Sequence, residues 1–361
     1  MAIKSYKGFD KNLRCRGFQY KIGGIYEMDG KIKMCNRGFH ACESPFDVFD
    51  YYTMIDSRFC EVEQDGDISK WDRGTKICSS KIKIKAELKL ADMINLGVEW
   101  LKEITSPEKI KTSIKDNSSG NNAQIGSSGD GAKIGSSGDG AKIGSSGDNA
   151  KIGSSGYDAQ IGSSGYGAQI GSSGYDARIG SSGNNAKIGS SGDGAQIGSS
   201  GYDAKIGSSG YDAQIGSSGN DAKIGSSGYD AQIGSSGNNA KIGSSGDGAK
   251  IGSSGYDAQI GSSGDGAQIG SSGYGAKISS SGYGAKIDST GEDCVIMCAG
   301  INSVAKASKG SWVTLSEWSY SEEKQRYIPI CVKTEFVDGE KIKADTYYSL
   351  KGGVFVEWIN D

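Results

Sequence analysis

One apolar residue recurs at every ninth position through the middle of the chain. Isoleucine holds this position from Ile125 to Ile287, and each unit reads Ala-x-Ile-Gly-Ser-Ser-Gly-x-x. In an extended segment, alternation puts Ala, Ile and the first Ser on one face, and x and the first Gly on the other. A fixed short period is typical of a stacked architecture, because one unit cannot bury a core alone but neighbouring units can. The pattern therefore predicts a β-solenoid.

The remaining Ser-Gly-x-x of each unit is turn chemistry, because Gly, Asn and Asp accept the backbone conformations of tight turns. The outward position between Ala and Ile alternates in character: it is mostly Lys in even-numbered repeats and mostly Gln in odd-numbered ones. We therefore expect two repeats to form one 18-residue coil with two flat parallel sheets. At ~4.8 Å between stacked strands, nine or ten coils would give a rod of about 45 Å.

The composition on either side of the array is that of ordinary globular protein. Residues 1–105 are predicted to form an α+β domain, with a strand at Lys81–Lys85 and a helix from Leu90 to Ile104 that Ser106-Pro107 ends. Residues 106–120 are predicted to be a linker or first capping turn, and 121–311 the solenoid. Residues 312–361 are predicted to be a β cap, since an uncapped coil would expose unpaired backbone. Its expected strands begin at Trp312, Ile328 and Val354. The fold class is thus mainly β.

Charge and composition exclude several classes of protein. Lys plus Arg is 40 and Asp plus Glu is 43, a balance that argues against a nucleic-acid binder, which carries a basic stripe. The 59 Gly with only 3 Pro exclude collagen. No apolar run is long enough for a membrane helix, and no apolar signal core is present at the start. With 8 scattered Cys, we expect a reduced, cytoplasmic protein. We expect no cofactor, because the sequence has neither a P-loop nor a glycine-rich dinucleotide fingerprint.

The turns of the repeat are similar to a calcium-binding nonapeptide, Gly-Gly-x-Gly-x-Asp-x-apolar-x. Asp158 and Asp176 are two of the residues at the carboxylate position, but Gly131 and Asn185 hold it in other units. A cation held by oxygen ligands needs several of them to converge. The alternative is that Asp, Asn and Gly simply form the turns.

Tyrosines and lysines of the array are the candidate binding residues. The tyrosines hold one turn position and should line the solenoid edges, where exposed Tyr among Gly, Ser and Asn suits recognition. The lysines of the even-numbered repeats should form one face that could attract anions. The alternatives are turn decoration and a solvated face. The candidates are Tyr157, Tyr166, Tyr175, Tyr202, Tyr211, Tyr229, Lys133, Lys151, Lys187, Lys205, Lys223 and Lys241.

The N-terminal domain holds zinc-ligand residue types. These are Cys15, Cys35, His40 and Cys42, and the spacing Cys-x4-His-x-Cys is not a standard zinc signature. Buried free cysteines are the alternative.

An enzymatic alternative depends on the same segment. The run Gly38-Phe39-His40-Ala41-Cys42, followed by Cys60-Glu61-Val62-Glu63, resembles the core order of ADP-ribosyltransferase-like folds. That resemblance implies a nicotinamide dinucleotide site lined by Tyr6 or Lys7, His40, and Glu61 or Glu63. The initial His or Arg of that family is absent.

The N-terminal motifs Tyr6-Lys7-Gly8-Phe9 and Gly38-Phe39-His40-Ala41-Cys42 precede a nonapeptide array. In this order the chain resembles a family of uncharacterised bacterial and phage or prophage proteins. The resemblance implies an origin in a mobile element and no particular activity.

We therefore expect a non-enzymatic interaction or scaffold protein whose solenoid presents a binding surface or spacer. A phage-encoded counter-defence factor that sequesters a host protein or small signal would be one form of it, acting in the host cytoplasm. The alternatives are the ADP-ribosyltransferase-like enzyme with the solenoid as a stalk, and a virion component. A homo-oligomer is possible for each, and neither membrane nor nucleic acid is an expected partner.

Overall fold

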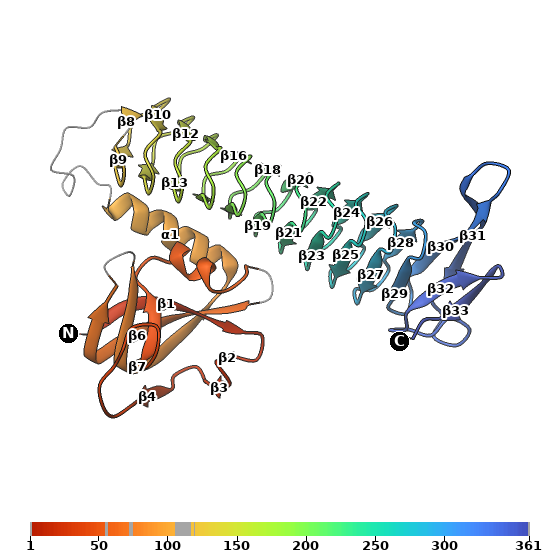
Figure 1. Cartoon of the computed structure of the whole chain (residues 1–361), viewed down its shortest axis with the longest axis horizontal. Coiled ribbons are helices and arrows are strands. Elements are labelled where there is room, and N and C mark those ends of the chain that lie inside the picture. The colour runs from red at the N-terminus through yellow and green to blue at the C-terminus, as the bar shows by residue number, and fades with distance from the viewer. Residues whose placement is uncertain (1, 55–56, 72–74, 105–116, 119, 360–361) are drawn as a thin grey trace. The chain divides into compact units, whose positions relative to one another are not determined.

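The computed structural model describes residues 2–54, 57–71, 75–104, 117–118 and 120–359 (Figure 1). The chain is mainly β, with 48% strand and 6% helix. It divides into two compact units: Met1–Ala186 with Gln196–Ser200, and Lys187–Ala195 with Gly201–Asp361. Most of the predicted linker at 106–120 lies outside the described residues.

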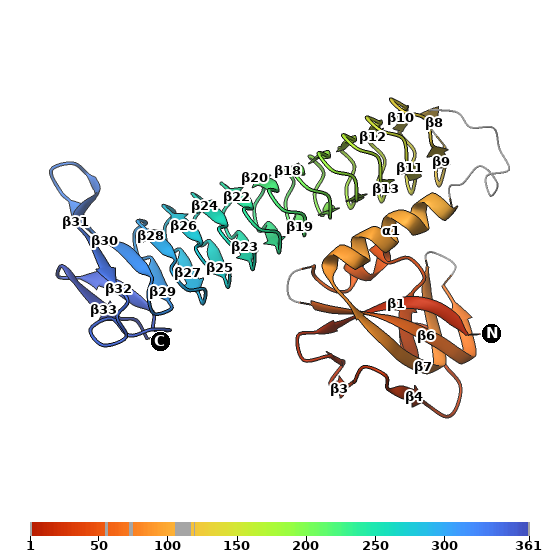
Figure 2. The same cartoon turned by 180° about the vertical axis from the view of Figure 1, so that it is seen from behind.

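The N-terminal domain is an antiparallel sheet that closes on itself. Strands β1, β5, β6 and β7 pair in a ring, because β7 bonds both β5 and β6, while β4 extends the sheet beside β7. A short hairpin of β2 and β3 follows β1. Figure 2 shows β6 and β7 as the long strands of this domain. The strands are β1 Ile3–Asp10, β2 Arg14–Cys15, β3 Phe18–Gln19, β4 Ile25–Glu27, β5 Phe39–Cys42, β6 Ser57–Lys70 and β7 Lys76–Leu88.

Two apolar clusters stabilise this domain. Inside the ring, Phe9, Val62 and Ile82 are fully buried. On its outer side, Tyr6 and neighbouring residues pack with the 3-10 helix η1 (Phe46–Asp50) and helix α1 (Leu90–Ile104). The predicted helix is confirmed at both ends, and the predicted strand at 81–85 lies within β7.

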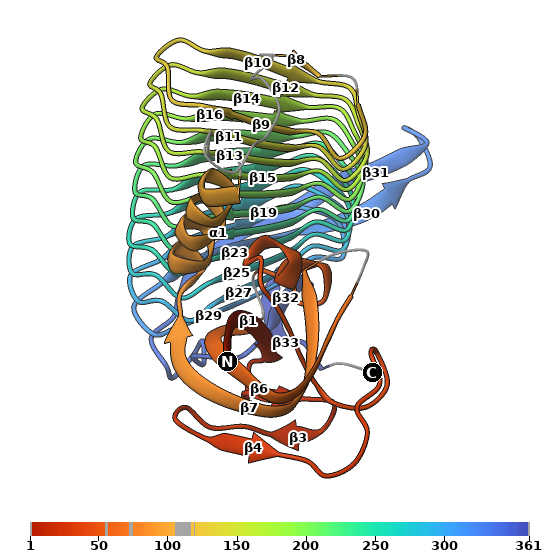
Figure 3. The same ribbon diagram turned by 90° about the vertical axis from the view of Figure 1, so that its left-hand side faces the viewer.

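The array forms two sheets of short parallel strands, seen in Figure 3. The first solenoid sheet contains β8 Asn117–Ser118, β10 Lys133–Ser136, β12 Lys151–Ser154, β14 Gln169–Ser172, β16 Lys187–Ser190, β18 Lys205–Ser208, β20 Lys223–Ser226, β22 Lys241–Ser244, β24 Gln259–Ser262, β26 Lys277–Ser280 and β28 Val295–Cys298. The second solenoid sheet contains β9 Gln124–Ser127, β11 Lys142–Ser145, β13 Gln160–Ser163, β15 Arg178–Ser181, β17 Gln196–Ser199, β19 Gln214–Ser217, β21 Gln232–Ser235, β23 Lys250–Ser253, β25 Gln268–Ser271, β27 Lys286–Ser289 and β29 Val304–Ala307.

Strands two repeats apart pair in register, so Ile134 lies against Ile152 and Ile143 against Ile161. The prediction of two repeats per coil is therefore confirmed. About eleven coils of ~18 residues span residues 124–315. The core holds Ala, Ile and Ser, as alternation predicts: in one repeat Ala159, Ile161 and Ser163 are all 0% exposed.

The turns explain why Asp, Asn and Gly replace one another along the array. The residue before each Ala has a left-handed backbone, with φ of 54° at Asp158, 56° at Asn149 and 67° at Gly131. Only Gly, Asn and Asp adopt this conformation at low cost. The residue before it uses its side chain within the stack, because Asp139 Oδ1 accepts the backbone N–H of Tyr157 at 3.0 Å. These observations favour the turn interpretation over the calcium one.

The C-terminal segment continues both sheets and then reverses direction. The first four residues of β30 (Trp312–Ser321) pair in parallel with β28, and the whole strand pairs antiparallel with β31 (Arg326–Phe336). In the second sheet, β32 (Tyr348–Lys351) bonds β29 and β33 (Val354–Glu357). The three predicted cap strands are present, and the coil pattern extends past the predicted boundary at 311 to residue 315. No helix among the described residues is long and apolar enough to cross a membrane.

Candidate functional site

Four lysines form an unbroken column on the first solenoid sheet. Lys187, Lys205, Lys223 and Lys241 lie side by side on β16, β18, β20 and β22. All four are exposed, and none makes an ion pair within the described part of the chain. Because neighbouring strands are ~4.8 Å apart, these like charges repel one another. A row of like positive charges of this kind favours anionic groups as ligands.

A column of glycines lies beside the lysines on the same outward side. Gly189, Gly207, Gly225 and Gly243 each face open space, since an added Cβ would meet nothing within 4 Å. We call the eight residues of these two columns the lysine face. It combines a row of positive charge with a smooth strip of backbone.

The two earlier candidate lysines lie on the same sheet. Lys133 and Lys151 pair in register on β10 and β12, and Gln169 follows them on β14. The prediction that the lysines of even-numbered repeats share one sheet is thus confirmed for all six candidates.

The second solenoid sheet shows what such an outward column can bind. Arg178 Nη2 lies 2.6 Å from Asp50 Oδ2, and Gln160 Nε2 donates to Asp47 Oδ1 at 3.2 Å. One coil before Gln160, the Lys142 ammonium lies 5.5 Å from the ring centre of Trp100. Acidic and aromatic side chains of η1 and α1 therefore cover this column.

The glycines of the second sheet receive apolar side chains from the same two helices. A Cβ added at Gly162 would lie 3.0 Å from Leu101, and one added at Gly198 would lie 2.8 Å from Ile94. Only a residue without a side chain lets α1 approach the strands this closely. Figure 3 shows α1 beside the strands of this sheet.

The candidate tyrosines lie at two different edges of the solenoid. Tyr157, Tyr175, Tyr211 and Tyr229 follow strands of the first sheet, whereas Tyr166 and Tyr202 follow strands of the second. Rings one coil apart stack on each other: Tyr157 on Tyr175 and Tyr211 on Tyr229, each with 5.3 Å between centroids. Stacking hides ring faces that a ligand would need. All six candidate tyrosines are about half-exposed, four of them are stacked in pairs, and because they lie at two edges they do not form one continuous surface.

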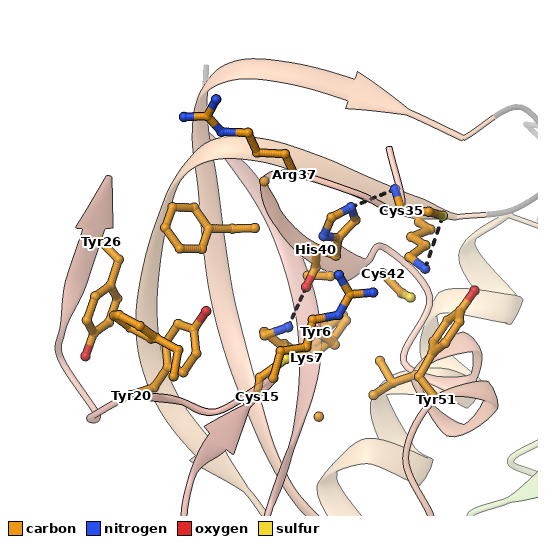
Figure 4. Close-up of a pocket in the computed structure, with 18 of the residues that line it drawn as sticks. Tyr6, Lys7, Cys15, Tyr20, Tyr26, Cys35, Arg37, His40, Cys42 and Tyr51 are labelled. Atoms are coloured by element: carbon orange, nitrogen blue, oxygen red, sulfur yellow. Dashed lines mark hydrogen bonds between the residues drawn. The ribbon is translucent and has the colours of Figure 1, made fainter. Parts of the chain in front are cut away.

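The N-terminal domain contains a cavity of about 890 Å³ that brings together several sequence candidates (Figure 4). Tyr6, Lys7 and His40 line it, with Tyr20 and Tyr26 on one side and Tyr51 on the other. Cys15, Cys35 and Cys42 also reach its wall.

Lys7 and His40, which both line this cavity, are joined by a hydrogen bond. Lys7 is only 6% exposed, and its ammonium donates to the His40 carbonyl oxygen at 2.8 Å. Burial lowers the pKa of Lys7. His40 Nε2 accepts the backbone N–H of Cys35 at 3.0 Å. Burial, helped by the nearby charges of Lys76 and Lys7, lowers the pKa of His40 to about 4, so the imidazole is neutral at pH 7.

The zinc prediction is not supported by this geometry. Cys15, Cys35, His40 and Cys42 line one cavity, but among the described residues no three His, Cys, Asp or Glu side chains are close enough to hold a metal ion. The one His uses Nε2 for a backbone hydrogen bond, and burial raises the pKa of the Cys42 thiol to about 12.

The site implied by the ADP-ribosyltransferase resemblance is not assembled either. Glu61 and Glu63 do not line the cavity; they pair with Lys4 at 2.9 Å and Lys85 at 2.7 Å. The physical reason is strand alternation: in β6, Val62 and Gln64 point into the ring, so the glutamates point out.

Sequence reasoning missed most of the charge around the cavity. Arg16, Arg37 and Lys76 line it, although they lie far apart in the sequence. A usable signal was present in β1, where Ser5, Lys7 and Phe9 share one face, so a lysine falls at an inward position of an otherwise buried strand.

Comparison with known proteins assigns no activity. Residues 3–96 match the model of a domain of unknown function, DUF7666. No curated protein matches the chain. No solved structure matches it either. The segment that shares this domain ends within α1, before the array begins, and it includes every strand that lines the cavity.

Proposed function

We propose that this chain is a non-enzymatic interaction protein whose lysine face binds an acidic amphipathic helix of a partner protein. The observation that carries the proposal is the column of four exposed lysines that form no ion pair among the described residues, set beside an open column of glycines. Phage origin, counter-defence and a virion role stay predictions.

The second solenoid sheet supports the choice of a helix as the occupant. There, the same repeat places an outward column beside a glycine column. Helix α1 puts Leu101 and Ile94 against these glycines, and η1 puts Phe46 against another. Asp47 and Asp50 meet the polar column at the same time. A partner with an apolar row flanked by carboxylates would repeat this arrangement on the lysine face.

Charge and apolar contact have separate roles in such a complex. Each exposed lysine–carboxylate pair contributes about 0.2–1 kcal/mol, and this contribution falls with salt. Each apolar side chain buried against the glycines contributes about 1.5–3 kcal/mol. The glycines should therefore supply most of the affinity, and the lysines the preference for an acidic partner.

The test uses the full chain and a fluorescein-labelled 18-residue helical peptide with a leucine row flanked by glutamates. Binding is followed by fluorescence anisotropy. Lys205→Gln with Lys223→Gln should weaken it about tenfold or more at low salt, because like-charge columns attract anions. Gln occurs at this position in other repeats, so the fold should be kept. The matched control, Lys250→Gln with Lys324→Gln, removes the same charge elsewhere and should leave the affinity within about twofold.

A second pair of variants tests the glycine column. Gly207→Val and Gly225→Val fill open space without a clash inside the chain, so they should abolish peptide binding and leave the melting temperature nearly unchanged. Equal loss in the charge-matched control would overturn the proposal. So would equally strong binding of heparin, or self-association that disappears in the Lys205→Gln, Lys223→Gln variant.

A further inference from the structure

The cavity of the N-terminal domain carries an excess of positive charge. Lys7, Arg16, Arg37 and Lys76 line it, whereas Glu27 is the one carboxylate among its lining residues. Glu27 is already paired with Lys81 at 3.1 Å. A bound cation would meet repulsion here, and a bound anion would be attracted.

The most buried of these charges lacks a carboxylate partner within the described residues. The Lys7 ammonium donates to the His40 carbonyl and lies 5.4 Å from the centre of the Phe9 ring. A buried ammonium without a counter-ion is costly, which agrees with the lowered pKa of Lys7. An anionic group in the cavity would offset that cost.

The walls of the cavity favour a planar apolar body. Phe18, Tyr20 and Tyr26 form an aromatic group with ring centroids 4.9 to 5.5 Å apart. On the other side the Lys76 ammonium lies 4.1 Å from the ring centre of Tyr51. A volume of about 890 Å³ matches the size of small-molecule sites in proteins.

We infer that this cavity binds a small organic anion in which a phosphate, sulfonate or carboxylate is attached to a planar aromatic body. The anionic group lies near Lys7, and the aromatic body lies against Tyr20 and Tyr26. This site is separate from the lysine face, which lies in the other compact unit, so each of the two can fail without the other.

The test compares two fluorescent probes of similar aromatic body on the full chain. 1-Anilinonaphthalene-8-sulfonate carries a sulfonate, and N-phenyl-1-naphthylamine carries no charge. Lys7→Met keeps the apolar stem and removes the charge. It should weaken sulfonate-probe binding about tenfold or more and change neutral-probe binding less than about threefold. Lys85→Met, a change on the outer surface of the same domain, should alter neither.

The competing outcomes are distinct. If Lys7→Met affects both probes equally, or neither, the anion site is wrong. If circular dichroism shows that Lys7→Met does not fold, Arg16→Gln at the more exposed rim replaces it, with the same expected difference between probes.

A chemical readout locates the probe. Cys15 and Cys35 line the cavity, while Cys331 lies far along the chain on β31. Saturating sulfonate probe should slow iodoacetamide alkylation of Cys15 and Cys35 at least threefold, and leave Cys331 unchanged, when peptides are quantified by mass spectrometry. No protection, or equal protection of Cys331, would overturn the assignment.

Discussion

Arg178 and Asp50 form a two-pronged ion pair, in which the guanidinium Nη2 and Nε both lie within 3.0 Å of the carboxylate. The Arg178 side chain is 13% exposed, and it is the one arginine at the outward position of the array, where the strands on either side in the same sheet have Gln160 and Gln196. The pair therefore attaches η1 to the coil that contains β15.

Replacing Arg178 by glutamine, the residue on the two neighbouring strands, should weaken the contact between η1 and the second solenoid sheet. Arg178→Gln leaves Asp50 partly buried without its cation, so we expect a loss of about 1–3 kcal/mol in local stability. Hydrogen–deuterium exchange should speed up in peptides covering η1 and α1. Lys187→Gln, the equivalent change on the next strand, should have no such effect. Unchanged exchange in both would contradict the role assigned to Arg178.

Two glycines at the same place in successive repeats should respond differently to valine. A Cβ at Gly180 would clash with the Phe46 ring, whereas one at Gly189 would meet nothing within 4 Å. Gly180→Val should lower the free energy of unfolding by about 1–3 kcal/mol, because the added side chain would force η1, which carries Phe46, away from the sheet. Gly189→Val should be neutral within about 0.5 kcal/mol. Urea denaturation followed by tryptophan fluorescence compares the two, and equal midpoints would show that the glycine column is not needed for packing.

Many inward serines of the array have a buried hydroxyl without a hydrogen-bond partner among the described residues, so replacing them could raise the stability. Ser217 Oγ is buried and has no hydrogen-bond partner among the described residues. Ser217→Ala should be neutral or stabilise by up to about 1 kcal/mol, since an unpaired buried hydroxyl is removed. In contrast, Ser303 Oγ accepts the Ala285 N–H at 3.0 Å, so Ser303→Ala should destabilise by about 1 kcal/mol. Thermal melts of the two variants should shift in opposite directions or differ clearly in size.

The single histidine should make the N-terminal domain sensitive to acid. Its pKa falls from 6.5 to about 4 on folding, so between these values the unfolded chain takes up a proton that the folded chain does not. The contribution of His40 to the free energy of unfolding is therefore fully present above pH 6.5 and is lost as the pH falls toward 4. The proton resonance of the His40 ring should titrate near 4 in the folded protein. His40→Gln should flatten the decline; an unchanged decline would assign it to carboxylates instead.

The solenoid and its 18-residue coil were predictable from the amino-acid pattern alone. Periodic Ile and Ala can be buried only by stacking, and turn residues tolerant of positive φ recur every nine positions. The strand and turn lengths of one unit predicted half a coil, and the alternation of Lys and Gln supported two repeats per coil; each sheet does take every second repeat. Helix α1 was also predictable, since its apolar stripe and its boundaries are local features.

The closed N-terminal sheet, the cavity and the contact between Arg178 and Asp50 were not predictable in this way, because each depends on residues far apart in the sequence. The ring depends on pairings between strands far apart in the sequence, such as Tyr6 with Glu61, which no local period encodes. The same pairings turned Glu61 outward and Lys7 inward, and so separated two residues that the sequence had suggested for one site. A repeat determines contacts between units that follow one another along the chain. A cavity depends on which side chains, distant in the sequence, are brought together inside the folded domain.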